Sequence, residues 1–268
     1  MNLSLETPSR ERLPKGLGWV AALLVLTGVA VFNAPLNQAW LLQLHSTHLG
    51  PDALWSFLTQ FGEGGAAFLL LIVAAQFAPR TSAVVVKSFL IGAVLSPLLK
   101  SLVASPRPLG VLDASVLHPI GSPPSGSNSM PSGHAMTVAA AISVALYMTR
   151  HAKHRGPLWL GLVLWGVLVA LSRVVVGAHW PADVLVGSGL GIMVALLALA
   201  WEQRVPWSPR LQTKPLQMVL LLLELGLVIY LFRAHADTDA ARLAFDLMAT
   251  VGIAGAMNRW IGLRRQTP

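Results

Sequence analysis

Three separate stretches of the sequence combine basic residues, histidines and one aspartate. They contain, in order, Lys100 with Arg107-Pro108, then Pro131-Ser132-Gly133-His134, and then Ser172-Arg173 with His179 and Asp183. Three cations and two histidines in one place repel one another unless an anion lies among them. Arginine guanidinium groups suit phosphate, because their planar fork bonds two oxygens at once. If the fold brings the stretches together, these residue types therefore predict a phosphate site.

The third stretch pairs a histidine with a carboxylate at the start of a helix. Pro181 is typical of a first helical turn, so Asp183 falls in that turn. We expect Asp183 to accept a hydrogen bond from one ring nitrogen of His179, leaving the other nitrogen free to attack phosphorus. His134, on a different helix, is the expected proton donor to the leaving oxygen. The predicted catalytic residues are therefore His179, His134 and Asp183.

The substrate phosphate is expected to contact basic side chains and one helix start. Ser132 is predicted to cap a helix whose first N–H groups point outward, and Gly133 lets the backbone approach an anion closely. The residues expected to bind the phosphate are Lys100, Arg107, Ser132, Gly133 and Arg173.

The composition indicates a membrane protein. Of the 268 residues 54% are hydrophobic and 11% are charged, with a mean hydropathy of +0.64, whereas about 25% are charged in a soluble domain. The chain has no cysteine, which excludes disulfides, zinc–thiolate sites and a thiol nucleophile. The isoelectric point of about 10.8 would suit a nucleic-acid partner, but the basic residues stand in short loops between apolar runs, as in membrane proteins. No nucleic-acid partner is expected.

The hydropathy pattern predicts an all-α polytopic membrane helix bundle. About 20 mostly apolar residues are needed to cross a bilayer, and the predicted spans are 16–33, 63–79, 83–102, 133–149, 157–176, 181–201, 215–232 and 242–260. Segment 34–62 is predicted to be amphipathic and interfacial, with a break at Gly50-Pro51. The loop 103–131 is long and rich in Pro, Gly and Ser. Glu224 falls inside a span, where a carboxylate needs a partner or a function.

Most of the 19 lysines and arginines fall in the segments that face one side if the N-terminus is cytoplasmic, as the positive-inside rule requires. This topology places the end of the third and fifth spans and the start of the fourth and sixth on the opposite face. The three stretches then converge there. We expect a multi-pass protein of a bacterial inner membrane whose site faces the periplasm.

The ordered motifs K-x6-R-P, P-S-G-H and S-R-x5-H-x3-D resemble the three-part signature of the type 2 phosphatidic acid phosphatase superfamily, which includes lipid phosphate phosphatases and undecaprenyl diphosphate phosphatases. The resemblance implies a six-helix catalytic membrane domain over 16–201, a nucleophile at His179, a proton donor at His134, and no metal or other cofactor. With the cytoplasmic segment 1–15 expected from the charge distribution, the chain divides into this segment, the catalytic domain, and a C-terminal extension 202–268 with two further helices of open role.

The predicted function is dephosphorylation of a lipid phosphate or diphosphate through a phosphohistidine. Undecaprenyl diphosphate, phosphatidylglycerol phosphate and phosphatidic acid are the expected substrates, and neither the choice among them nor the oligomeric state follows from the motif spacing. An alternative is a lipid phosphotransferase or a lipid A phosphatase that uses the same residues. A non-catalytic lipid-binding or transport protein is less favoured, because transporters place ionisable groups near the midplane rather than at helix ends.

Overall fold

The computed structural model describes residues 16–265 except 48–49, 114 and 122–125, so the predicted cytoplasmic segment 1–15 lies outside the described residues. No β-strand forms in the described part, and the predicted all-α class is confirmed. Helices occur at each predicted span: α1 (Gly16–Val31), α4 (Gly64–Ala74), α5 (Pro79–Val103), α6 (Gly133–Met148), α7 (Arg155–Val175), α8 (Pro181–Arg204), α10 (Lys214–Arg233) and α11 (Asp239–Arg265).

Helix length and apolarity support several membrane crossings. Five described helices are long and apolar enough to span a bilayer, namely α5, α7, α8, α10 and α11. Two bent pairs raise the number to seven if each is one span. In the first pair α1 meets α2 (Pro35–Ser46) at 102°, and in the second α3 (Asp52–Thr59), with the short turn η1 (Gln60–Gly62), meets α4 at 66°. The multi-pass membrane character is thus confirmed, and α2 and α3 occupy the segment predicted to be amphipathic.

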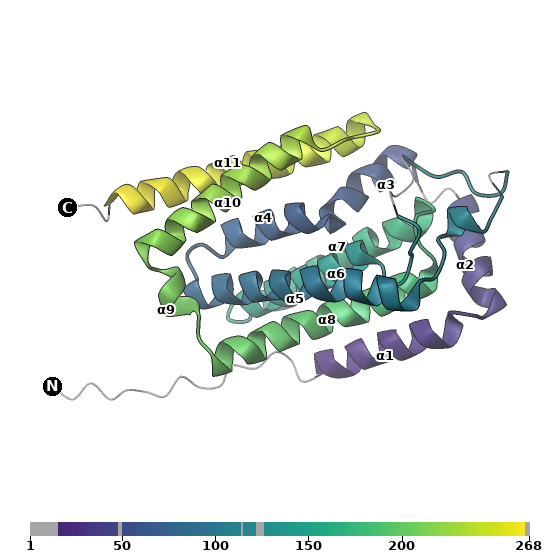
Figure 1. Ribbon diagram of the computed structural model, residues 1–268, viewed down its shortest axis with the longest axis horizontal. Helices are drawn as coiled ribbons and strands as arrows, with labels where there is room; N and C mark the ends of the chain where they lie inside the picture. The colour runs from purple at the N-terminus through teal and green to yellow at the C-terminus, as the bar shows by residue number, and fades with distance from the viewer. Residues whose placement is uncertain (1–15, 48–49, 114, 122–125, 266–268) are drawn as a thin grey trace.

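Most of the helices run along the long axis of the molecule, whereas α2 lies across one end of the bundle (Figure 1). Helix α8 packs against α1, α5 and α6, while α10 and α11 pack against α4 on the side away from α1. One end of the bundle carries α2, α3 and the irregular loop that follows α5; we call it the loop end. The opposite end carries α9 (Ser208–Leu211).

Glycines let α6 approach α8 closely just beneath the loop end. A Cβ atom at Gly187 would lie 2.5 Å from the backbone oxygen of Ser132, and one at Gly191 would lie 2.2 Å from that of Met136. These distances are too short for any side chain, so α8 must present glycine here. The N-terminal turns of α6 and α8, which carry His134 and Asp183, are consequently held side by side.

Helices α10 and α11 form a C-terminal hairpin, residues 214–265, joined by a buried ion pair. The Arg259 guanidinium donates to both carboxylate oxygens of Glu224 at 2.6 and 2.9 Å, and to Gln217 at 2.5 Å. Both charged side chains are almost completely buried. The partner that an intramembrane Glu224 requires is therefore Arg259.

Candidate active site

The loop end contains a cavity of about 690 Å³. Six of the eight predicted site residues line it, from three helices and two adjoining loops: Lys100, Arg107, Gly133, His134, Arg173 and His179. The other two, Ser132 and Asp183, are completely buried behind this lining. The structure therefore brings together residues that are up to 83 positions apart.

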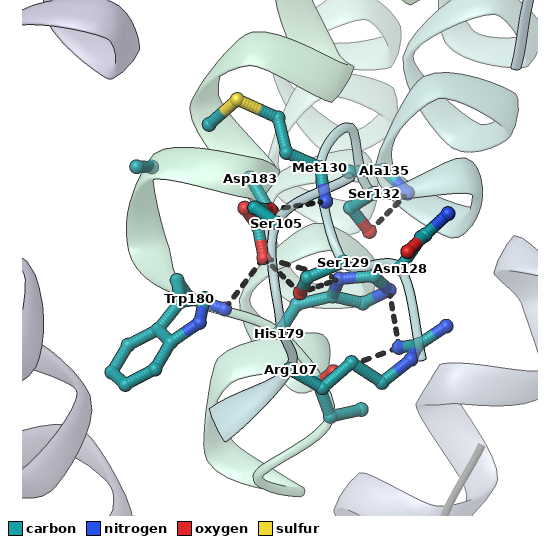
Figure 2. Close-up of polar contacts among 12 residues, drawn as sticks. Ser105, Arg107, Asn128, Ser129, Met130, Ser132, Ala135, His179, Trp180 and Asp183 are labelled. Atoms are coloured by element: carbon teal, nitrogen blue, oxygen red, sulfur yellow. Dashed lines mark hydrogen bonds and ion pairs between the residues drawn. The ribbon is translucent and has the colours of Figure 1, made fainter. Parts of the chain in front are cut away.

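The two nitrogens of the His179 ring have different surroundings (Figure 2). Nδ1 lies 3.3 Å from Oδ2 of Asp183 and 3.2 Å from the Ser129 hydroxyl, whereas Nε2 lies 3.2 Å from a terminal nitrogen of Arg107. A guanidinium can only donate, so Nε2 is the acceptor and carries the lone pair. The proton of the neutral ring is then on Nδ1, and the nitrogen that carries the lone pair is the one beside the basic residues.

Asp183 is oriented from several sides. Its Oδ2 accepts the Trp180 N–H at 2.9 Å and also the Ser129 hydroxyl, and its backbone oxygen accepts the Ser132 N–H at 3.0 Å. This arrangement follows from its place in the first turn of α8, where Pro181 starts the helix and the carboxylate reaches back to the preceding backbone.

Ser129 was not predicted from the sequence, although it contacts both members of the His179–Asp183 pair. It precedes the P-S-G-H motif within a serine-rich run, where nothing distinguishes it from its neighbours. The run is positioned by backbone hydrogen bonds: the Ser129 N–H donates to Ser105 at 2.8 Å. The Met130 N–H also donates to the Ser105 hydroxyl at 3.2 Å, so the two ends of the loop after α5 are held together beside Asp183.

The three cations are held in place by uncharged oxygens. Arg107 donates to the backbone oxygens of Gly126 at 2.5 Å and Ala178 at 2.9 Å, and Lys100 donates to that of Asn128 at 3.4 Å. The buried Arg173 guanidinium donates to the hydroxyl of Thr59 on α3. Because carbonyl and hydroxyl oxygens do not neutralise a cation, the cavity keeps a positive charge suited to an anion.

Burial lowers the pKa of His179 well below its ordinary value of 6.5, and the positive charges of Arg173, Arg107 and Lys100 lower it further. At neutral pH the ring is therefore uncharged, which is the form whose nitrogen can attack an electrophile. Burial also lowers the pKa of Arg107, and the negative charge of Asp183 opposes this effect.

His134 lies where η1 and α4 meet the start of α6. A Cβ atom at Gly62 would come within 2.8 Å of the His134 Cβ, so this contact requires glycine. His134 also lines a second, largely apolar cavity of about 280 Å³ between α4, α5 and α6. One histidine thus borders both a basic cavity and an apolar one.

No group of three or more His, Asp or Glu side chains suited to a metal ion occurs in the described part of the chain. Basic side chains and the helix start at Gly133 line the cavity.

The three motifs of this site lie within a match to a known protein family. The family model of the PAP2 superfamily matches residues 65–207, which is more than half of the chain and includes all three motifs. The chain belongs to the PAP2 superfamily. The predicted resemblance is confirmed, and the match ends before the C-terminal hairpin begins at Lys214.

Curated relatives of this PAP2 protein act on different lipids according to their names. Undecaprenyl-diphosphatase of Sulfolobus acidocaldarius is 35% identical over 121 residues, covering 44% of this chain and 54% of its own length. Phosphatidylglycerophosphatase B of Bacillus subtilis is 33% identical over 84 residues, covering 30% of this chain and 41% of that protein. The chain thus spans about half the length of these relatives. Lipid A 1-phosphatase of Rhizobium johnstonii is 28% identical over 204 residues, 68% of this chain and 80% of that protein.

Two solved structures share the fold of this PAP2 protein. The PAP2-type phosphatidylglycerolphosphate phosphatase of Bacillus subtilis superposes with a TM-score of 0.56 at 21% identity, covering 71% of this chain and 98% of the other. LpxE of Aquifex aeolicus superposes with a TM-score of 0.54 at 22% identity, covering 63% of this chain and 97% of the other. The predicted membrane phosphatase fold is therefore confirmed.

Proposed function

We propose that this PAP2 protein is an integral membrane phosphatase that hydrolyses a lipid phosphate or lipid diphosphate through a phosphohistidine at His179. The observation that carries the proposal is the orientation of the His179 ring. Its Nδ1 faces Asp183, and its Nε2 lies 3.2 Å from Arg107, at the basic cavity.

In the first step the phosphate occupies the cavity between Lys100, Arg107 and Arg173, whose charges stabilise the equatorial oxygens of the transition state. Nε2 of His179 attacks phosphorus, so that an N–P bond forms while the P–O bond to the lipid breaks. With the phosphate bound, its negative charge favours the protonated form of His134, which gives its proton to the leaving oxygen. The Asp183 carboxylate stabilises the positive charge that develops on the His179 ring.

In the second step water attacks the phosphohistidine. His134, now neutral, takes a proton from the water, the N–P bond breaks, and inorganic phosphate leaves. Both histidines return to their starting protonation states. The route needs no metal ion, because the basic side chains and the N–H groups at the start of α6 supply the positive charge.

The second cavity supports a lipid as the substrate. Its lining includes Phe68, Leu71 and Phe89, and it shares Pro97, Gly133 and His134 with the catalytic cavity. The apolar cavity thus lies beside His134, the proposed proton donor to the leaving oxygen. This position suits a substrate whose hydrocarbon tail stays in the membrane while its phosphate enters the basic cavity. Undecaprenyl diphosphate, phosphatidylglycerol phosphate and phosphatidic acid are the proposed substrates.

Lipid A 1-phosphate is a second candidate substrate. It is favoured because the lipid A 1-phosphatase of Rhizobium johnstonii aligns over 80% of its length, a larger share than the other two relatives described. The same chemistry would transfer the phosphoryl group to a lipid acceptor if one replaced water.

The test is phosphate release by the detergent-purified protein, with EDTA present, from these four lipids and from glucose 6-phosphate. We expect release from at least one lipid, and at least a thousandfold loss in His179→Ala, because the covalent route then has no nucleophile. His154→Ala is the matched control: this exposed histidine lies at the opposite end, before α7, and should leave the rate unchanged.

Three results would contradict the proposal. They are normal turnover in His179→Ala, a requirement for a metal ion, and release from glucose 6-phosphate alone. Label from a ³²P substrate that is trapped at His179 but passes to an added lipid instead of water would establish the phosphotransferase alternative.

A further inference from the structure

The C-terminal hairpin, which lies outside the family match, reaches the catalytic cavity. The turn between α10 and α11 and the first turn of α11 contribute His235, Asp237 and Ala241 to its lining. These side chains share one cavity with Lys100 and His179. Part of the catalytic cavity is therefore built by an extension that lies outside the family match.

The turn is fixed to the same helix that holds one of the phosphate-binding arginines. The hydroxyls of Thr238 and Ser56 lie 2.6 Å apart, with Ser56 buried on α3. Thr238 also accepts the Ala241 N–H at 3.0 Å and so caps α11. Three residues after Ser56, Thr59 accepts the hydrogen bond of Arg173. The hairpin turn and the phosphate site thus share α3 as a common support.

Asp237 is the one acidic side chain among the described residues that line the cavity. Its Oδ1 lies 2.7 Å from Nε2 of His235, and a Cβ atom at Gly121 would be 3.6 Å from its Oδ2. The carboxylate therefore stands where the hairpin turn meets the loop after α5. In a cavity built for phosphate, a carboxylate opposes a second phosphate group and instead accepts hydrogen bonds from hydroxyl groups.

We propose that the C-terminal hairpin is the headgroup-selecting wall of this cavity, and that Asp237 accepts a hydrogen bond from a hydroxyl of the glycerol or sugar that carries the scissile phosphate. The same carboxylate disfavours a diphosphate headgroup. The inference rests on the proposed lipid phosphatase activity and specifies its substrate class.

The test compares kcat/KM for four substrates in the full-length protein. Phosphatidylglycerol phosphate and lipid A 1-phosphate carry glycerol and sugar hydroxyls, undecaprenyl diphosphate carries a second phosphate, and phosphatidic acid, which has neither, is the reference. Relative to this reference, Asp237→Ala should lower kcat/KM for the hydroxyl-bearing substrate about fivefold and raise kcat/KM for the diphosphate about fivefold. A lower kcat/KM for phosphatidylglycerol phosphate would identify a glycerol hydroxyl as the group that Asp237 binds, and a lower kcat/KM for lipid A 1-phosphate would identify a sugar hydroxyl.

Two further variants separate charge from hydrogen bonding. Asp237→Asn keeps an acceptor oxygen, so it should retain most of the activity on the hydroxylated lipid while still gaining on the diphosphate. Asp239→Ala removes an exposed carboxylate two residues away that is not part of the cavity lining, and it should change no ratio.

Equal substrate ratios in the wild type and Asp237→Ala would overturn the inference while leaving the phosphatase proposal intact. Wild-type protein that releases phosphate from none of the lipids would instead overturn the proposed function, and this inference would fall with it.

Discussion

At the scale of single residues, the candidate nucleophile is defined by what its two nitrogens contact. An unpaired histidine exchanges its proton between two tautomers, but here Arg107 can only donate to Nε2, and Asp183 accepts on the Nδ1 side. The lone pair is thereby directed toward the basic cavity before a substrate arrives. Preorganisation of this kind lowers the barrier because no reorientation is needed during the reaction.

Ser129 is expected to act as a positioning residue for this pair. Its hydroxyl contacts Asp183 and lies 3.2 Å from Nδ1 of His179, but it does not line the cavity. Ser129→Ala should slow phosphohistidine formation about tenfold, the effect of losing about 1.4 kcal/mol, with KM nearly unchanged because the phosphate contacts remain. Single-turnover labelling with a ³²P substrate measures the step.

Ser115→Ala is the matched control for Ser129→Ala, since Ser115 is an exposed serine in the same loop and does not line the cavity. An equal loss of rate in both variants, or a loss of Ser129→Ala activity that follows a lower melting temperature, would argue against a positioning role.

At the scale of helices, glycine positions decide how near the catalytic groups stand. The contact of α8 with α6 depends on Gly187 and Gly191, and that of η1 with His134 depends on Gly62. At Gly187 and Gly191 the backbone of α6 lies where a side chain would be, which brings the start of α6 to the start of α8, whereas Gly62 leaves room for the His134 side chain. The chemistry is therefore built on helix ends whose separation is set by packing several residues below.

The C-terminal hairpin depends on its buried ion pair. Arg259→Met should destabilise the protein by about 3 kcal/mol, because it leaves the Glu224 carboxylate buried without its charged partner. The measurement is thermal unfolding of the detergent-solubilised variant.

The double variant Arg259→Met with Glu224→Leu removes both charges and should recover most of the lost stability. The control Asp246→Asn alters a half-exposed pair with Arg242 on the same helix, where an effect under about 1 kcal/mol is expected. If the double variant is no more stable than Arg259→Met, the ion pair is not the source of the effect.

At the scale of the whole molecule, the candidate site lies at one end of the bundle. The catalytic cavity, α2, α3 and the hairpin turn lie at the loop end, while α9 and the start of α7 lie at the other. The positive-inside distribution of charge predicts that the loop end faces the periplasm.

Cysteine accessibility tests this orientation directly, since the chain has no native cysteine. Val116→Cys, at an exposed position in the loop after α5, should react with a membrane-impermeant maleimide in intact cells. Lys153→Cys, exposed before α7, should react only after the membrane is permeabilised. The reverse pattern would place the site in the cytoplasm.

The sequence by itself determined the membrane class, the helix positions, the three motifs and their convergence on one end. These features follow from apolar run length and from residue types at short spacing, which are local properties. The catalytic and phosphate-binding roles of individual residues stay predictions that the variants above test.

Only the tertiary structure decided which side chains meet across long distances in the chain. Four such contacts join residues from separate segments. They are the contact of Ser129 with Asp183, the hydrogen bond from Arg173 to Thr59, the ion pair of Arg259 with Glu224, and the entry of the hairpin turn into the cavity. The spacing of residues within one segment does not predict such contacts, because they depend on which helices pack side by side and not on the periodicity within one helix. The role proposed for the extension therefore comes from packing, where the sequence left it open.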